Sequence, residues 1–222
     1  MWDLTFDDMC DKLEGRENFS LARVGDGEWL CILGASGSNC DAHPYYRDLS
    51  LSLAFVLLQG QRYYMGMQPK ATKDLGAQIA SWIARNECDI EWCNADIIHD
   101  ASIADRLEEM FFALRGRKVV LVGPPHLKPI AMRLRAPHIE TPSFPAWKAW
   151  TTLYADMAEQ LDGDSVVLYC SGMATEVMLA KAHDEYGDTI TQIDVGSAFD
   201  PLCGVCSRKY HKQILARLKE QI

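Results

Sequence analysis

Two acidic residues, Asp26 and Glu28, stand two positions apart in a segment where each follows a glycine, Gly25 and Gly27. Carboxylates at this spacing repel each other unless a cation lies between them. Hard cations such as Mg²⁺ and Mn²⁺ take oxygen ligands, commonly one or two carboxylates together with substrate phosphates. Glycines let the backbone approach a ligand closely. The spacing predicts a divalent-cation site or, equally well, an acidic turn in which Glu28 caps the next helix.

Arg23 interrupts the apolar segment that leads into these acids. A lone arginine in a strand is usually an edge or surface residue. So close to two carboxylates it has two further roles: an ion pair with Asp26, or a guanidinium directed at a phosphate. We count Arg23, together with Gly25 and Gly27, among the candidates for holding a phosphate-bearing ligand.

Two further loops follow apolar segments. His126 comes after Gly-Pro-Pro and is a candidate acid or base near neutral pH, although a plain polar loop residue is the commoner case. Ser171 and Gly172 precede a helical pattern, where free backbone N–H groups suit a phosphate. Ser171 as an ordinary helix cap is an equal alternative. The loop lacks the full glycine pattern of a dinucleotide site and the Gly-Lys-Ser/Thr of a P-loop.

The C-terminal part of the chain supplies the remaining candidates. Asp194 and Asp200 flank a Gly-Ser pair, and either could act as a general base or make a simple turn hydrogen bond. Arg208 is a candidate for contacting a phosphate, or it only starts the last helix. Trp147 and Trp150 lie near prolines and are candidates for stacking against a ligand, whereas Trp82 lies on an apolar helical stripe typical of a core residue.

Strand patterns and helix patterns alternate along nearly the whole chain. We expect strands at residues 19–24, 118–122, 165–170 and 189–195, and helices at residues 5–15, 44–60, 72–87, 146–161, 173–186 and 208–221. This order predicts a single α/β domain over residues 1–222, with a Rossmann-like, mostly parallel sheet and helices on both faces. Ligands bind at the carboxyl ends of such strands, which is where the candidate residues stand.

Composition narrows the classes of function. The net charge of −9 weighs against a general nucleic-acid binder. No stretch is apolar for long enough to span a membrane, and no signal peptide is visible, so we expect a cytoplasmic protein. The eight cysteines are scattered, which favours reduced thiols. Cys203 and Cys206 have the spacing of half a zinc site, but no second half with matching spacing is present.

A resemblance to a known family covers residues 17 to 210. Residues 19–28, Phe-Ser-Leu-Ala-Arg-Val-Gly-Asp-Gly-Glu, resemble the N-terminal signature of the GT-D-fold glycosyltransferases, a bacterial and phage family long called a domain of unknown function. Shorter, weaker similarities follow in order at residues 94–96, 119–124, 171–173, 194–200 and 207–210. The similarity falters between about residues 35 and 60. The family carries an Asp-x-Glu motif for the sugar donor.

The resemblance implies a GT-D-type fold and the transfer of a sugar from a UDP-sugar. In that case Asp26 and Glu28 would hold Mn²⁺ or Mg²⁺ on the diphosphate, and Asp194, Asp200 or His126 would serve in catalysis. The acceptor stays open: a glycan, a protein, a lipid-linked saccharide or a modified DNA base. Two alternatives remain, a metal-dependent phosphoesterase or nucleotide hydrolase and a non-catalytic nucleotide-binding module.

Overall fold

The computed structural model describes residues 3–60, 62–142 and 145–220, and the strands of these segments form one seven-stranded sheet in the order β3-β2-β1-β7-β6-β4-β5. Every neighbouring pair is parallel. The strands are β1 (Ser20–Val24), β2 (Tyr64–Met67), β3 (Trp92–Asn94), β4 (Lys118–Gly123), β5 (His138–Glu140), β6 (Ser165–Tyr169) and β7 (Thr191–Asp194). The predicted α/β class with a parallel sheet is confirmed.

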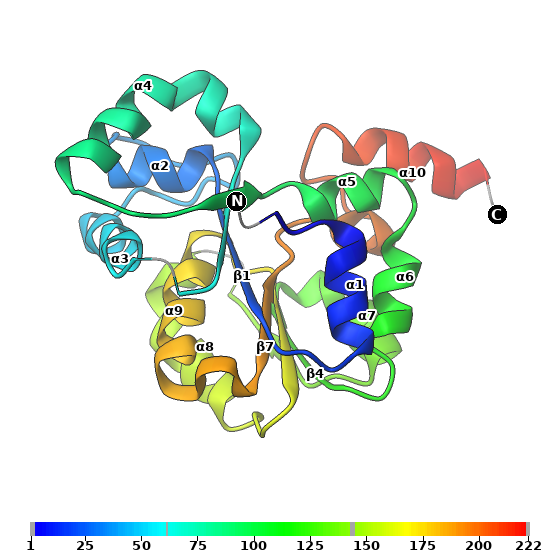
Figure 1. Ribbon diagram of the computed structural model, residues 1–222. Coiled ribbons are helices and arrows are strands. Elements are labelled where there is room, and N and C mark those ends of the chain that lie inside the picture. Colours follow the sequence, from blue (N-terminus) through cyan, green and yellow to red (C-terminus); the bar gives the residue numbers. More distant parts are fainter. Residues whose placement is uncertain (1–2, 61, 143–144, 221–222) are drawn as a thin grey trace.

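Helices cover both faces of the sheet, which Figure 1 shows nearly edge-on. One face carries α2 (Asp26–Ile32), α3 (Arg47–Leu58), α4 (Pro69–Arg85), α8 (Trp150–Ala158) and α9 (Thr175–Tyr186). The other carries α1 (Phe6–Glu14), α5 (Ile97–Ile103), α6 (Leu107–Ala113) and α7 (Lys128–Leu134). The last helix, α10 (His211–Glu220), lies beside α5, where Arg217 donates to the carbonyl of Ile103 at 2.7 Å.

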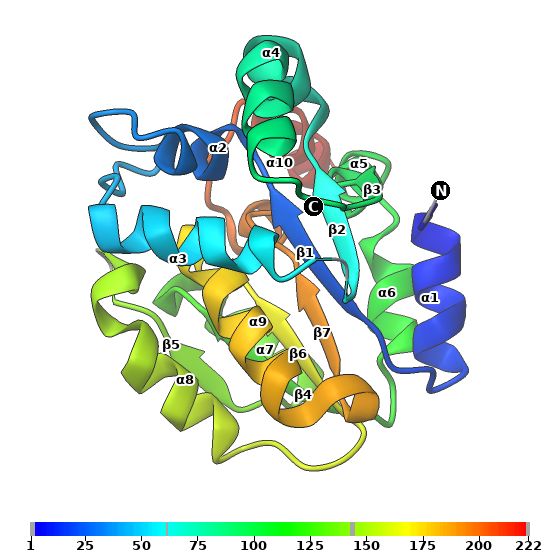
Figure 2. The same ribbon diagram turned by 60° about the vertical axis from the view of Figure 1, so that its left-hand side comes forward.

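The central strands are apolar on both sides because both sides are covered. In β4, Val120 and Val122 join the apolar core under α8 and α9, while Val119 and Leu121 join the core under α6 and α7. Each of these four side chains is at most 3% exposed. The sheet therefore lies between the two apolar cores, which fix the positions at which its strands end. Figure 2 shows α3, α8 and α9 on one side of the strands and α1 and α6 on the other.

Local signals explain several helix boundaries. Thr5 caps α1 by accepting from the N–H of Asp8, whose carboxylate accepts in return from the N–H of Thr5 at 3.0 Å, as the sequence predicted. The helix predicted to begin at Pro44 starts instead at Arg47. Residues 37–45 form a closed loop in which the Asn39 side chain accepts from the N–H groups of Asp41 and His43. This Asx-type turn holds Pro44 in a bridge with Ser38, outside the helix.

Two predicted helices begin with a tighter turn. Residues Ala146–Ala149 and Gly172–Ala174 are 3-10 turns that run into α8 and α9. The predicted last helix extends over Gln221, which lies outside the described residues, and it begins at His211 rather than Arg208. Within the part of the chain that the structure describes, no helix is both long and apolar enough to cross a membrane.

Parallel pairing places the carboxyl ends of all seven strands at the same edge of the sheet. β1 lies between β2 and β7, so the loop after Val24 and the loop after Asp194 are neighbours although 170 residues of chain separate them. The loops after β6 and β4 come next along the same edge. This arrangement brings together the loops that carry the candidate residues.

Candidate functional site

A hollow opens at the carboxyl ends of β1 and β7. Its wall includes Asp26 and Glu28 from the start of α2, Asp194 from the end of β7, and Glu176 from α9. Gly25, Gly27, Gly172 and Arg208 line it too, so most of the predicted donor-site residues share one cavity. We call it the acidic hollow.

Asp26 and Glu28 occupy different environments within this hollow. The side chain of Asp26 is 37% exposed and forms an ion pair with Lys70 at the start of α4. Glu28 turns inward and accepts from the backbone N–H of Gly25 at 2.8 Å. Burial raises the pKa of Glu28, and the nearby Asp194 raises it further. The predicted capping role of Glu28 is present, and Glu28 also faces the cavity.

Glu176 completes a group of three carboxyls with the partly buried Glu28 and the buried Asp194. Its side chain belongs to a residue only 2% exposed, and Oε2 has no hydrogen-bond partner among the described residues. Burial raises the pKa of Glu176 well above the usual value, and the charge on Glu28 adds to the effect; burial likewise raises the pKa of Asp194. The charges of Glu28 and Asp194 disfavour the charged form of Glu176, whereas a hydrogen bond with Glu176 favours the charged form of Asp194, so the three carboxyls suit either a bound cation or a shared proton.

These acids fit a hard cation because they offer oxygen atoms only, one of them buried without a partner. No group of three or more His, Cys, Asp or Glu side chains within residues 3–60, 62–142 and 145–220 is arranged around a common metal position. A cation held by Asp26 and Glu28 would thus take its other ligands from phosphate oxygens and water, as Mg²⁺ usually does.

Arg23 is buried beneath the acidic hollow and does not pair with Asp26. Its Nε donates to the carbonyl of Ala95 at 2.5 Å, and its Nη atoms lie 3.8 Å from carboxylate oxygens of Asp96 and Asp194. Nη2 also contacts Nδ1 of His99 at 3.1 Å, and burial and the Arg23 charge lower the pKa of His99 to about 4. The positive charge of Arg23 therefore offsets part of the negative charge at the floor of the acidic hollow, which Arg23 also lines.

A second hollow lies beside the first, outside the ends of β4 and β6. His126, Asp200, Ser171 and Ser207 line it, and it also touches Gly172 and Arg208, which both hollows share. With a volume of about 270 Å³ against about 120 Å³, it is the larger of the two. We call it the His126 hollow.

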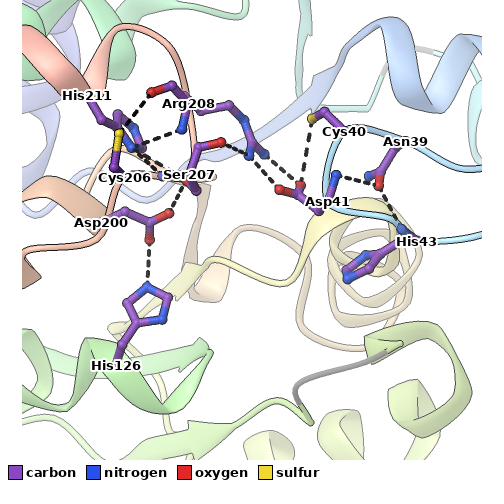
Figure 3. Close-up of polar contacts among 10 residues, drawn as sticks. All are labelled: Asn39, Cys40, Asp41, His43, His126, Asp200, Cys206, Ser207, Arg208 and His211. Carbon is purple, nitrogen blue, oxygen red and sulfur yellow. Dashed lines mark hydrogen bonds and ion pairs between the residues drawn. The ribbon is translucent and has the colours of Figure 1, made fainter.

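His126 and Asp200, predicted separately, are hydrogen-bonded to each other. Nε2 of His126 lies 2.8 Å from Oδ1 of Asp200, and the hydroxyl of Ser207 donates to Oδ2 of the same carboxylate (Figure 3). Nδ1 of the buried His211 accepts from the backbone N–H of Ser207 at 3.2 Å. The Asp200 carboxylate is therefore held on both oxygens and orients the imidazole of His126.

Arg208 stands between the two hollows. Its Nη2 donates to Oδ2 of Asp41 at 2.6 Å, and Nη1 makes the second half of a two-pronged pair with Oδ1 (Figure 3). Asp41 comes from the 37–45 loop, so this pair ties that loop to the segment before α10. The guanidinium of Arg208 lines both hollows and is hydrogen-bonded to a carboxylate. A phosphate can take the place of a carboxylate in such a pair.

The loop after β6 borders both hollows at Gly172. The hydroxyl of Ser171 donates to the carbonyl of Val122 at 3.2 Å and does not cap the following turn. Gly172 has φ of +59°, and a Cβ there would lie 3.2 Å from Nδ1 of His43. The predicted cap role of Ser171 is wrong, because its hydroxyl is directed toward β4.

The predicted aromatic contacts lie elsewhere. Trp147 is 7% exposed in the core and stacks on Trp150 with ring centroids 5.7 Å apart. Neither ring lines either hollow, so the prediction that they face a ligand is wrong. Trp82 packs against Trp29, which confirms its predicted core position. Cys203 and Cys206 carry free thiols, as do the other six cysteines.

The arrangement of the chain matches solved structures. One is described as a new glycosyltransferase (DUF1792) from Streptococcus sanguinis: TM-score 0.68, 16% identity, 93% of this chain and 86% of that chain covered. Another is described as the highly conserved domain of unknown function 1792 with a distinct glycosyltransferase fold: TM-score 0.64, 15% identity, 89% and 78% covered. No family model and no curated protein matches the chain. The chain shares the fold of these structures, which confirms the fold that the resemblance predicted.

Proposed function

We propose that this protein is a metal-dependent glycosyltransferase that uses a nucleotide sugar, a UDP-sugar by the resemblance of residues 19–28, as its donor. The observation that carries the proposal is the acidic hollow, in which Asp26, Glu28, Glu176 and Asp194 converge at the carboxyl ends of β1 and β7. The shared fold with DUF1792 glycosyltransferase structures supports it. Residues 1–222 would act as one catalytic domain.

Asp26 and Glu28 are the residues that would hold Mn²⁺ or Mg²⁺. The bound cation would supply charge neutralisation on the diphosphate of the leaving nucleotide. Arg208 would contact the diphosphate once Asp41 releases it, and Gly172, which lacks a side chain, would let the backbone of the β6 loop come close. Arg23, whose Nη1 lies 3.8 Å from a carboxylate oxygen of Asp194, offsets part of the effect by which burial raises the pKa of Asp194.

The proposed cellular setting is the cytoplasm. All eight cysteines are free, which agrees with the reducing cytoplasm in which we expect the protein to act. The net charge of −9 makes a duplex acceptor, including a modified base, the least favoured of the acceptor classes.

Calorimetric titration of UDP with and without Mn²⁺ tests the donor site. We expect UDP to bind only with Mn²⁺ and the Asp26→Asn variant to lose this metal-dependent binding. Asp156→Asn, an exposed acid on α8 away from both hollows, is the matched control and should bind as the native protein does.

Two results would contradict the proposal. UDP binding that is equal with and without Mn²⁺, and equal in Asp26→Asn, would indicate a nucleotide-binding module in which the acidic turn is structural. Rapid release of phosphate from UDP or from simple phosphoesters would indicate the hydrolase.

A further inference from the structure

The His126 hollow lies next to the acidic hollow and is not needed to hold a cation. The two cavities share Gly172, Gly196, Ser197, Asp41 and Arg208 as a common wall. A molecule in the His126 hollow would therefore face whatever occupies the acidic hollow. If the donor sugar is held by the acidic hollow, the second cavity is where an acceptor would meet it.

The imidazole of His126 is prepared to accept a proton. Nε2 lies 2.8 Å from a carboxylate oxygen of Asp200, a residue that is 6% exposed. Because a carboxylate can only accept a hydrogen bond, Nε2 carries the ring hydrogen and donates it. Nδ1 then holds the free lone pair, and no described residue donates a hydrogen bond to it. The side chain is 32% exposed and lines the hollow. An orienting carboxylate, an imidazole and an open nitrogen are the parts of a general base.

We propose that the His126 hollow binds a neutral, hydroxyl-bearing acceptor and that His126 is the catalytic base that removes the proton of the attacking hydroxyl. This inference rests on the glycosyl-transfer function proposed above. The acceptor oxygen forms a bond to the anomeric carbon while the bond from that carbon to the diphosphate oxygen breaks. The electron pair of the broken bond leaves with the nucleoside diphosphate, and the acceptor proton moves to Nδ1 of His126.

The charges of the hollow favour a neutral acceptor. Its described wall contains two carboxylates, Asp41 and Asp200, and one guanidinium, Arg208, with no lysine. Arg208 is already paired with Asp41, and burial lowers the pKa of His43, which keeps that ring uncharged. A phosphate-bearing acceptor would meet excess negative charge here. Pro124, Pro142, Ala146 and Val205 add apolar surface suited to the C–H groups of a sugar or another alcohol.

The two aspartates predicted as alternative bases are less well placed. Asp200 accepts hydrogen bonds on both oxygens, from His126 and Ser207, so it positions the imidazole and has no free oxygen for a substrate. Asp194 belongs to the acidic hollow, where it accepts from the N–H of Gly196 at 2.9 Å and faces Arg23. Asp200 is thus a positioning residue, and Asp194 belongs with the donor site.

The test measures UDP release from UDP-glucose, UDP-galactose and UDP-N-acetylglucosamine, with water or concentrated glycerol as the hydroxyl probe and Mn²⁺ present. We expect His126→Ala to lower the rate at least about 100-fold, the usual contribution of a general base, with UDP affinity within about threefold of native. Added imidazole should restore part of the rate. His183→Gln, on α9 outside both hollows, is the control.

A second variant tests the positioning role. Asp200→Asn should slow the native enzyme but have no further effect in the His126→Ala background, because Asp200 acts only through that ring. An equal loss in both backgrounds would overturn this role.

The outcomes separate this inference from the function on which it rests. A His126→Ala variant that keeps the native rate, or that loses both rate and UDP affinity without rescue by imidazole, overturns the base assignment but not the proposed function, which is judged on the native protein. Faster transfer to glycerol 3-phosphate than to glycerol overturns the neutral acceptor. A native protein that binds UDP with Mn²⁺ but turns over none of these donors overturns the transferase and this inference together.

Discussion

Gly196 gives the most direct test of how tightly the floor of the acidic hollow is packed. Its φ is +59°, a left-handed conformation, and a Cβ added there would lie 2.3 Å from Nη1 of Arg23 and 3.2 Å from Nε2 of His99. Arg23 cannot move away freely, because its Nε donates a hydrogen bond to the carbonyl of Ala95. Gly196→Ala therefore combines backbone strain with a displaced guanidinium.

Gly204 provides the matched control. It too has positive φ, +76°, but a Cβ there would meet nothing within 4 Å. The left-handed conformation costs an L-residue about 1–2 kcal/mol at either position. Overpacking adds about 1–3 kcal/mol at Gly196 alone. We expect the free energy of unfolding to fall by about 1–2 kcal/mol in Gly204→Ala and by about 2–5 kcal/mol in Gly196→Ala.

Urea unfolding followed by far-ultraviolet circular dichroism measures both values, and UDP titration with Mn²⁺ measures the effect on the site. Gly196→Ala should also weaken UDP binding, whereas Gly204→Ala should not. Equal losses of stability in the two variants, with native UDP affinity in Gly196→Ala, would refute the packing described for Arg23.

Two further predictions concern the polar residues of the cleft. His99 is neutral in the folded protein with its pKa lowered to about 4, so stability is lost as pH falls from about 6.5 to about 4. In urea unfolding, the free energy of unfolding of the native protein should fall by about 3 kcal/mol more than that of His99→Gln over this pH range. An equal fall in the two proteins would contradict the prediction. Asp41→Asn should bind UDP several-fold more tightly in calorimetry, since Arg208 is freed for the diphosphate. Weaker or unchanged binding would show that the pair supports the site instead. The free energy of unfolding of Asp41→Asn should differ from that of the native protein by less than about 1 kcal/mol, because the side chains of Asp41 and Arg208 are both partly exposed.

The strands that build the cleft could be predicted because they are buried on both faces. β4 and β6 are uninterrupted apolar runs between polar ends, and such runs predict a covered parallel sheet. Once the sheet is parallel, its carboxyl strand ends share one edge, which is why Asp26, Asp194 and His126 were expected to stand where ligands bind. The hydrogen bond between His126 and Asp200 could not be predicted from the sequence, because it joins residues of two different loops that meet only in the folded structure.

The edge strands escaped prediction for a physical reason. β3 and β5 have three residues each and are partly exposed, so neither shows an apolar run or a full alternation. Pairing with β2 and β4 makes them strands, and the sequence around them does not encode that pairing locally.

Glu176 was missed because a glutamate in the first turn of a helix is ordinary, favoured there by the helix dipole. Only the packing of α9 against β1 and β7 turns it toward Asp194. Likewise, the partners of Asp26 and Arg208 lie 44 and 167 residues away in sequence, beyond the reach of any local pattern.

The position of β1 has a consequence for how the chain folds. Leu21 pairs with Tyr64 on one side and with Ile193 on the other, so one edge of β1 stays open until nearly all of the chain is available. Such distant pairings make folding slow, and an uncovered strand edge invites association with other chains during that delay. A nascent chain on the ribosome would carry the Asp-x-Glu segment long before Asp194 and Arg208 emerge. The cleft is therefore among the last parts to form, and fragments that end before β7 should aggregate instead of binding nucleotide.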